Sequence, residues 1–265
     1  MKKNGFTLAE ILVTLGIIGI VSAITVPSLM SNFQKKTYET GAKKAYNTVS
    51  NAISTYMANE AIDDLTEAPF IGTKVNTYGS RENTTRYDTK TTQLQTFVNK
   101  YFKVVSLCDG YEKCFSDSFY SLDHSTSAKW SSFVSGSIAV LAPGQLPGTM
   151  SRCTVGAQLA DGMSMCFNAV SATKDTIQAF GSIKESTTET KNTENTMFVD
   201  VDINGVAGPN VSGRDIFTMS VNSNGVVAFA NFTENDRATA ISNAKKNATP
   251  LNIAVLRSNG WQMDY

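Results

Sequence analysis

The sequence predicts an α+β fold in which one long N-terminal helix packs on an antiparallel β-sheet. The helix is indicated by an apolar stretch over residues 11–30 and by a helical periodicity that continues to about residue 59. The sheet is indicated by short apolar runs that flank Asp161-Gly162 and Asn224-Gly225, two turn signals of β-hairpins. An amphipathic helix needs a partner for its apolar stripe, and the apolar face of a sheet provides one.

The overall composition is that of an ordinary globular protein with balanced charge. The 265 residues include 23 Lys and Arg and 23 Asp and Glu, so the formal net charge is zero. A nucleic-acid-binding chain would be expected to carry a basic stripe or patch. The single histidine, His124, has no triad signature around it. We therefore expect neither nucleic-acid binding nor enzymatic activity.

The N-terminal segment has the length and composition of a membrane span. No charged residue lies between Glu10 and Lys35. A helix of about 20 residues spans about 30 Å, the thickness of the hydrocarbon core of a bilayer. Lys2 and Lys3 would hold the N-terminus on the cytoplasmic side, so that the rest of the chain lies outside.

An ordinary signal peptide is the alternative interpretation of this segment. It would use the same lysines and would be cut after Val21-Ser22-Ala23, a small-residue site. A carboxylate at the membrane centre costs about 2.5–3.5 kcal/mol, and a signal peptide has no use for the one on Glu10. The helical pattern also continues well beyond the cut. Both observations favour an anchor.

The outer half of the helix is predicted to be amphipathic. Its apolar stripe implies that a globular domain packs against it. Pro27, with Gly16 and Gly19 upstream, predicts a bend or local melting near the membrane surface. The stripe consists of Ala42, Ala45, Tyr46, Val49, Ala52, Ile53, Tyr56 and Met57.

The start of the helix carries a specific motif. Gly5 is followed by Phe6-Thr7-Leu8-Ala9-Glu10 and the apolar run, which resembles the processing motif of type IV prepilins and type II secretion pseudopilins. The resemblance covers about the first thirty residues and implies a pilin-like fold. It implies that a membrane aspartyl peptidase cuts between Gly5 and Phe6 and then methylates the amino group of Phe6. Glu10 would be the fifth residue of the mature chain and would pair with the N-terminal amine of a neighbouring subunit.

The physical chemistry of a carboxylate in lipid makes this role of Glu10 intelligible. A lone charge there is unfavourable, and burial raises the pKa of a carboxyl until it becomes neutral unless a cation lies close by. The penalty therefore becomes a driving force for docking a new subunit. The alternative is a solvated Glu10 at the membrane interface.

The resemblance also implies an organisation and a set of partners. The chain would comprise a leader peptide (1–5), the membrane and assembly half of the helix (6–30), its amphipathic half (31–60) and an extracytoplasmic globular domain (61–265). The partners would be other copies and pilin-like subunits, the prepilin peptidase, the inner-membrane assembly platform and membrane lipid. The chain would sit in the bacterial inner membrane as a single-pass protein before it enters an extracytoplasmic filament.

Three functions are compatible with these patterns. The first is a structural subunit of a type IV pilus-like filament or of a type II secretion pseudopilus, which the N-terminus does not separate. The second is a secreted extracytoplasmic binding protein or adhesin with an ordinary signal peptide. The third is an enzyme that stays anchored in the membrane.

The four cysteines form two local pairs. Two small-loop disulfides, Cys108–Cys114 and Cys153–Cys166, are the simplest interpretation, because neither spacing is that of a zinc ribbon or a redox motif. Disulfides would place the domain in an oxidising compartment. Four unpaired thiols are the alternative.

The globular region is predicted to alternate polar loops with short elements. We expect an exposed connector over 61–92, a short amphipathic helix ending near Val105 and a polar loop over 184–196. The predicted strands are 136–141, the hairpin of 154–159 with 163–170, and the hairpin of 217–221 with 226–232.

One cluster of oxygen-bearing side chains suggests a cation site. Asp200, Asp202 and Asn204 alternate and precede Gly205, as in a tight loop around calcium. The late Glu of an EF-hand is absent, and Asp215 would supply this carboxylate instead. The 200–217 segment also resembles a stretch common in large pilin-like proteins, and some pseudopilins bind calcium in a C-terminal loop. An ordinary turn is the alternative, because Asp, Asn and Gly all favour turns.

Overall fold

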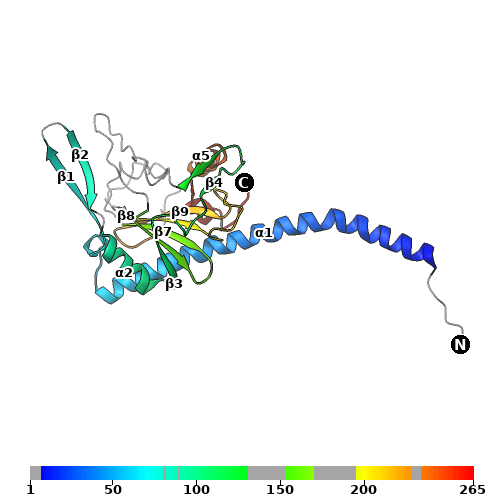
Figure 1. The fold of residues 1–265 in the computed structure, drawn as a ribbon, viewed down its shortest axis with the longest axis horizontal. Coiled ribbons are helices and arrows are strands. Elements are labelled where there is room, and N and C mark those ends of the chain that lie inside the picture. Colours follow the sequence, from blue (N-terminus) through cyan, green and yellow to red (C-terminus); the bar gives the residue numbers. More distant parts are fainter. Residues whose placement is uncertain (1–6, 80–81, 89, 131–152, 170–194, 228–233) are drawn as a thin grey trace. The chain divides into compact units, whose positions relative to one another are not determined.

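The computed structural model describes residues 7–79, 82–88, 90–130, 153–169, 195–227 and 234–265. The chain divides into two compact units, Met1–Tyr38 and Glu39–Tyr265. A single helix, α1 (Leu8–Glu60), contributes to both units (Figure 1).

The N-terminal unit is the apolar half of α1. Large apolar side chains are exposed along its whole length. The exposed fraction is 78% for Leu8 near its start and 68% for Phe33 near its end. Within the described residues, α1 is the helix that is long and apolar enough to cross a membrane. The helix is unbroken across Pro27, so the expected local melting is not observed there, and a bend at this residue stays a prediction.

The second half of α1 carries the predicted stripe into the globular unit. Its buried members are Glu39, Ala42, Ala45, Val49, Ala52, Ile53 and Tyr56. The helix approaches the rest of the unit closely at Gly41, where an added Cβ would lie 2.4 Å from Cγ2 of Ile203. Small residues therefore set how closely the helix packs, and the predicted apolar stripe is buried at Ala42, Ala45, Val49, Ala52, Ile53 and Tyr56.

The connector predicted for 61–92 is wrong in two respects. First, Leu65, Phe70 and Ile71 are buried, around a short 3₁₀ helix, η1 (Leu65–Glu67). Second, β1 (Thr73–Gly79) and β2 (Glu82–Asp88) pair as an antiparallel hairpin outside the main sheet. The threonines that made the segment look like a loop are also good strand formers, so polarity alone misled the prediction.

A six-stranded sheet forms the centre of the globular unit, in the order β10-β9-β8-β7-β6-β3. Neighbouring strands are antiparallel except for β10 and β9, which are parallel. Its strands are β3 (Val104–Asp109), β6 (Val155–Leu159), β7 (Ser164–Asn168), β8 (Asn195–Asp202), β9 (Ile216–Asn222) and β10 (Leu251–Asn252). This confirms the antiparallel sheet expected from the sequence.

The predicted elements around this sheet have mixed outcomes. The β6–β7 hairpin across Asp161-Gly162 is confirmed. The second hairpin is reduced, among the described residues, to a bridge between Val221 and Val227, and β9 pairs mainly with β8. The amphipathic helix is α2 (Thr91–Tyr101), which ends before Val105 because β3 begins at Val104. The strand predicted at 136–141 lies outside the described residues.

The two faces of the sheet bury different side chains. One face carries Met165, Val201 and Phe217, which lie opposite one another on β7, β8 and β9, and the second half of α1 runs along this sheet in Figure 1. The other face, with Cys166 and Ile216, belongs to a core of mainly aromatic side chains and both disulfides. This core comes from the segment that includes β4 (Ser118–Tyr120) and β5 (Ser127–Lys129).

The C-terminal elements lead to the last residues of the chain, which contact α1. They are α5 (Glu234–Lys246), β10 and α6 (Ala254–Ser258). The ring of Trp261 lies 5.3 Å from that of Tyr46, and the buried Glu39 carboxylate accepts a hydrogen bond from the Met263 N–H at 2.8 Å. The last residues thereby fix the point on α1 at which the globular unit begins.

Candidate functional site

The predicted assembly residue, Glu10, lies in the first turn of α1. Gly5 and Phe6, the predicted processing residues, lie outside the described residues. Oε2 of Glu10 accepts hydrogen bonds from the N–H and the hydroxyl of Thr7, both at 2.8 Å. The Thr7 hydroxyl in turn accepts from the Glu10 N–H at 3.2 Å. This reciprocal pair is a capping box, which satisfies N–H groups that the first turn of a helix leaves free.

The capping box could have been found in the sequence. Its signature, Thr-x-x-Glu before an apolar run, is present at residues 7–10. The cap holds one oxygen of Glu10 against the backbone. Its other oxygen, Oε1, accepts no hydrogen bond within the part of the chain that the structure describes. Glu10 thus has both a structural role at the helix start and an oxygen to offer a neighbour.

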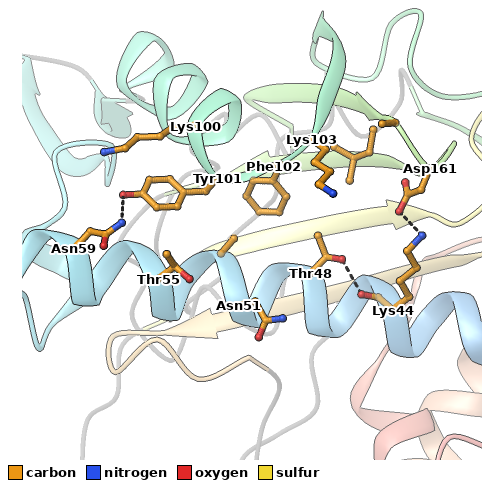
Figure 2. A pocket seen from close by; sticks show the side chains of 13 residues that line it. Lys44, Thr48, Asn51, Thr55, Asn59, Lys100, Tyr101, Phe102, Lys103 and Asp161 are labelled. Atoms are coloured by element: carbon orange, nitrogen blue, oxygen red, sulfur yellow. Dashed lines mark hydrogen bonds and ion pairs between the residues drawn. The ribbon is translucent and has the colours of Figure 1, made fainter.

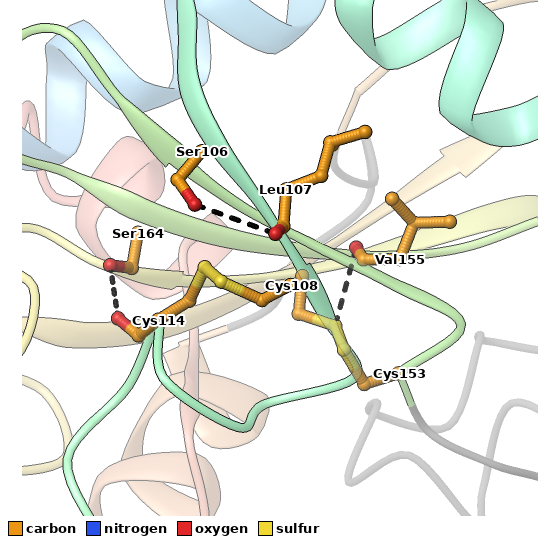
Figure 3. Close-up of a disulfide and its surroundings, with 8 residues drawn as sticks. Ser106, Leu107, Cys108, Cys114, Cys153, Val155 and Ser164 are labelled. Carbon is orange, nitrogen blue, oxygen red and sulfur yellow. Dashed lines mark hydrogen bonds between the residues drawn. A yellow bond between two sulfur atoms is a disulfide. The ribbon is translucent and has the colours of Figure 1, made fainter.

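Both expected disulfides are present in the globular unit (Figure 3). Cys108 and Cys114 are 6.1 Å apart between Cα atoms, and Cys153 and Cys166 are 5.5 Å apart. Ser164 on β7 donates to the carbonyl of Cys114 at 2.5 Å. Cys108–Cys114 therefore ties the aromatic core to the edge strand β3, whereas Cys153–Cys166 and the Ser164 hydrogen bond tie it to β7.

Two of the predicted metal ligands meet at the loop between β8 and β9. Asp202 ends β8, Asp215 directly precedes β9, and both side chains are fully buried. The Asp215 carboxylate accepts hydrogen bonds from the N–H groups of Asn210 at 2.8 Å and Val211 at 2.6 Å. These bonds fold the loop back over the strand ends.

The electrostatics of this pair are unfavourable as it stands. Burial raises the pKa of Asp202 well above its ordinary value, and the nearby charge of Asp215 raises it further. Burial also raises the pKa of Asp215, while the N–H groups of Val211 and Asn210 partly offset this. Among the described residues, neither carboxylate has an ion pair with a Lys or Arg. Two buried acids therefore share a site without a compensating positive charge.

The amide of Asn204 completes the group. Its Nδ2 donates to the Gly208 carbonyl at 2.8 Å, whereas its Oδ1 is buried without a hydrogen-bond partner. An orphaned acceptor beside two buried carboxylates is the donor set that a hard cation would satisfy.

Asp200 is not part of this group, because its carboxylate is hydrogen-bonded to another side chain. It lies within β8, and its Oδ2 accepts a hydrogen bond from the Tyr111 hydroxyl at 2.5 Å. In the described ranges, no cluster of three or more His, Cys, Asp or Glu could hold a metal ion. A cation here would thus need the Asn204 oxygen, together with backbone or water oxygens, besides Asp202 and Asp215.

The layout, a long apolar N-terminal helix followed by an antiparallel-dominated α+β domain, is consistent with the pilin-like fold that the N-terminal motif implies. Residues 1–26 match the model of the prokaryotic N-terminal methylation motif. The chain is also 33% identical over 76 residues to the type II secretion system core protein G of Escherichia coli (strain K12), a match that covers 26% of this chain. It spans about half of that relative, 52% of its length. No solved structure matches.

The buried acid pair predicts an unusual dependence of stability on pH. In the unfolded chain Asp202 has an ordinary pKa of about 3.9, whereas in the fold its pKa is raised. In metal-free buffer its contribution to stability is therefore complete below about pH 4 and is lost as the pH rises through the folded pKa. Asp202→Asn should remove this loss and raise the free energy of unfolding at pH 7.

The measurement is denaturant unfolding of the full chain in detergent with chelator, between pH 4 and 8. Asp109→Asn, at an exposed position at the end of β3, is the matched control and should keep the wild-type pH profile. Identical pH profiles for Asp202→Asn and the wild type would contradict the role assigned to the buried pair.

Proposed function

We propose that this chain is a structural subunit of an extracytoplasmic filament, either a type IV pilus-like filament or a type II secretion pseudopilus. The observation that carries the proposal is the methylation motif over residues 1–26, continuous with the apolar half of α1. The similarity to a type II secretion core protein supports the pseudopilus within this pair. The role is mechanical rather than enzymatic.

Maturation in this proposal consists of cleavage between Gly5 and Phe6 and methylation of the new amine by the prepilin peptidase. Lys2 and Lys3 keep the leader in the cytoplasm, where the peptidase meets it, while the domain lies outside. The disulfides agree with an oxidising exterior. After cleavage the inner-membrane assembly platform transfers the subunit from lipid to the filament.

The capping box supports different roles for the two oxygens of the Glu10 carboxylate. Cleavage before Phe6 leaves the Thr7 N–H intact, so the cap survives maturation. Oε1 can then pair with the methylated amine of a neighbouring subunit. Because a charge in lipid is costly, formation of this pair favours docking.

An ordinary signal peptidase is a poorer fit to the structure. Its site after Ala23 would fall in the middle of the unbroken α1. The mature N-terminus separates the two routes. We expect mass spectrometry of the protein from cell envelopes to find N-methylated Phe6. A mature chain that begins at Ile24 would instead establish the secreted binding protein.

Removal of the assembly carboxylate should uncouple processing from polymerisation. Glu10→Ala should leave cleavage after Gly5 largely intact and lower the filament yield by roughly tenfold or more, since about 1.4 kcal/mol of lost docking energy is a tenfold change. Sheared-filament and envelope fractions would be compared by immunoblotting.

Thr14→Ala is the matched control for this variant. Within the described residues, the Thr14 hydroxyl bonds backbone carbonyls of its own helix, at Glu10 and Ile11, so the filament yield should stay normal. A wild-type filament yield from Glu10→Ala would rule out the charge-pair mechanism.

We also propose that Asp202, Asn204 and Asp215 hold a calcium ion that stabilises the loop between β8 and β9. Calcium prefers carboxylate and amide oxygens and would neutralise the repulsion between the two acids. Asp200 stays with Tyr111. The ion would have a structural role, consistent with a site built between the ends of two central strands.

Calcium should therefore reverse the order of stability of the wild type and Asp202→Asn. At pH 7 with chelator, Asp202→Asn should melt above the wild type, because it lacks the buried repulsion. With millimolar calcium, the wild type should gain stability through binding to the native state, about 2.7 kcal/mol at a hundredfold excess over Kd. Asp202→Asn should gain little. Wild-type melting that is unchanged by calcium and chelator would leave the loop as an ordinary turn.

A further inference from the structure

A groove with several lysines runs beside the second half of α1 (Figure 2). Its volume is about 760 Å³. One wall is a stripe of α1 from Lys44 to Asn59, which spans about 22 Å at 1.5 Å per residue. The opposite wall is the end of α2 and its connection to β3, and the β6–β7 turn closes one end.

The α1 wall of the groove is polar and uncovered. Asn51, Thr55 and Asn59 line it, and all three are exposed. Buried side chains such as Phe102 and Leu159 form the interior side. A polar wall of this kind is stable in water, so the groove does not need an apolar partner. It offers hydrogen bonds to a polar partner surface.

Three ammonium groups line the groove, and the chain neutralises two of them. Lys44 pairs with Asp161 at 2.8 Å at one end, and Lys100 pairs with Glu60 at 3.7 Å at the other. Lys103 extends into the groove between these ends and forms no ion pair with the described residues (Figure 2). The groove is therefore complementary to carboxylates, with its unsatisfied charge in the middle.

The same chain carries a matching acidic segment that begins at the last residue of α1. Four acids fall within Glu60–Glu67, and no Lys or Arg interrupts them: Glu60, Asp63, Asp64 and Glu67. Asp63 and Glu67 are exposed, whereas Asp64 is used to cap η1. The contact of Glu60 with Lys100 shows that this chemistry already fits one end of the groove.

The acidic segment is held in place on its own globular unit by Leu65, beyond the end of the groove of the same chain. Leu65 is buried, and its N–H donates to the Ser223 carbonyl at 2.7 Å. Asp63 and Glu67 are therefore displayed on one part of the globular unit and Lys103 on another. In a filament, a contact that joins these two different surfaces in one direction is head-to-tail, and its repetition gives an open helical assembly.

We propose that the groove around Lys103 receives the acidic segment Glu60–Glu67 of a second copy of this chain. The inference rests on the proposed filament function and adds a second contact, outside the membrane, to the one at Glu10. Each pair at the surface contributes little, but a filament repeats the contact at every subunit. Charge complementarity would also set the register between neighbouring domains.

A zero-length cross-linker tests the contact without any substitution. Carbodiimide joins an ammonium and a carboxylate only when they are in contact, so filaments would be assembled from a mixture of isotopically light and heavy full-length chains. Mass spectrometry should find mixed light–heavy peptides that join Lys103 to Asp63 or Glu67. Wild-type filaments without such a mixed cross-link would overturn the proposal.

Charge reversal is the second test of the contact between Lys103 and the acidic segment. Lys103→Glu should lower the assembled fraction roughly tenfold, because it places like charges opposite each other. Adding Asp63→Lys and Glu67→Lys to the same chain should restore assembly. Lys113→Glu, at an exposed lysine outside the groove, is the matched control and should assemble normally.

The possible outcomes separate the two proposals. Normal assembly of Lys103→Glu, or loss of assembly that the paired reversal does not restore, would overturn the second-copy contact while the filament function stands. A wild-type chain that is processed at Phe6 but forms no filament would instead refute the proposed function itself. Melting of each purified variant at the wild-type temperature shows that the substitutions leave the fold intact.

Discussion

The continuous backbone of α1 must suit two environments, and most of the structure follows from this constraint. Its first half exposes apolar side chains such as Leu8 and Phe33, which are acceptable only in lipid or against other helices. Its second half buries a narrow stripe that includes Val49 and Ile53. One helix therefore belongs to both compact units of the chain.

The globular unit is built around the burial of that stripe. One face of the sheet supplies apolar partners, and the close approach at Gly41 depends on the missing side chain. The opposite face cannot use the same helix, so it buries an aromatic core that two disulfides hold in place. Buried acids remain at the sheet's end, where the charge of Asp215 acts on Asp202 and, among the described residues, no Lys or Arg pairs with either. Helix and disulfides stabilise the fold, while the acid pair lowers stability until a ligand or a proton neutralises it.

Local patterns gave good predictions where one short-range rule decides the outcome. The turn at Asp161-Gly162 fixes the β6–β7 hairpin, and helical spacing fixes the buried positions of α1. Predictions failed where local composition was the only guide and strand pairing decided the outcome. The threonine-rich segment after α1 forms the β1–β2 hairpin, and Asp200 and Asp202, predicted to lie in a cation-binding loop or an ordinary turn, lie in β8. In β8, hydrogen bonds to both neighbouring strands outweigh the turn preference of Asp.

By itself, the sequence determined the N-terminal motif, the apolar length, the amphipathic stripe and the pairing of cysteines that lie close together along the chain. These are local properties, since each depends on residues within a few turns or strands. The tertiary structure alone decided which acids share a site, because Asp202 and Asp215 are brought together by the return of β9 beside β8. It also decided that Asp200 belongs to Tyr111, 89 residues away. Lys103 likewise becomes part of a groove only when α2, β3 and α1 are assembled.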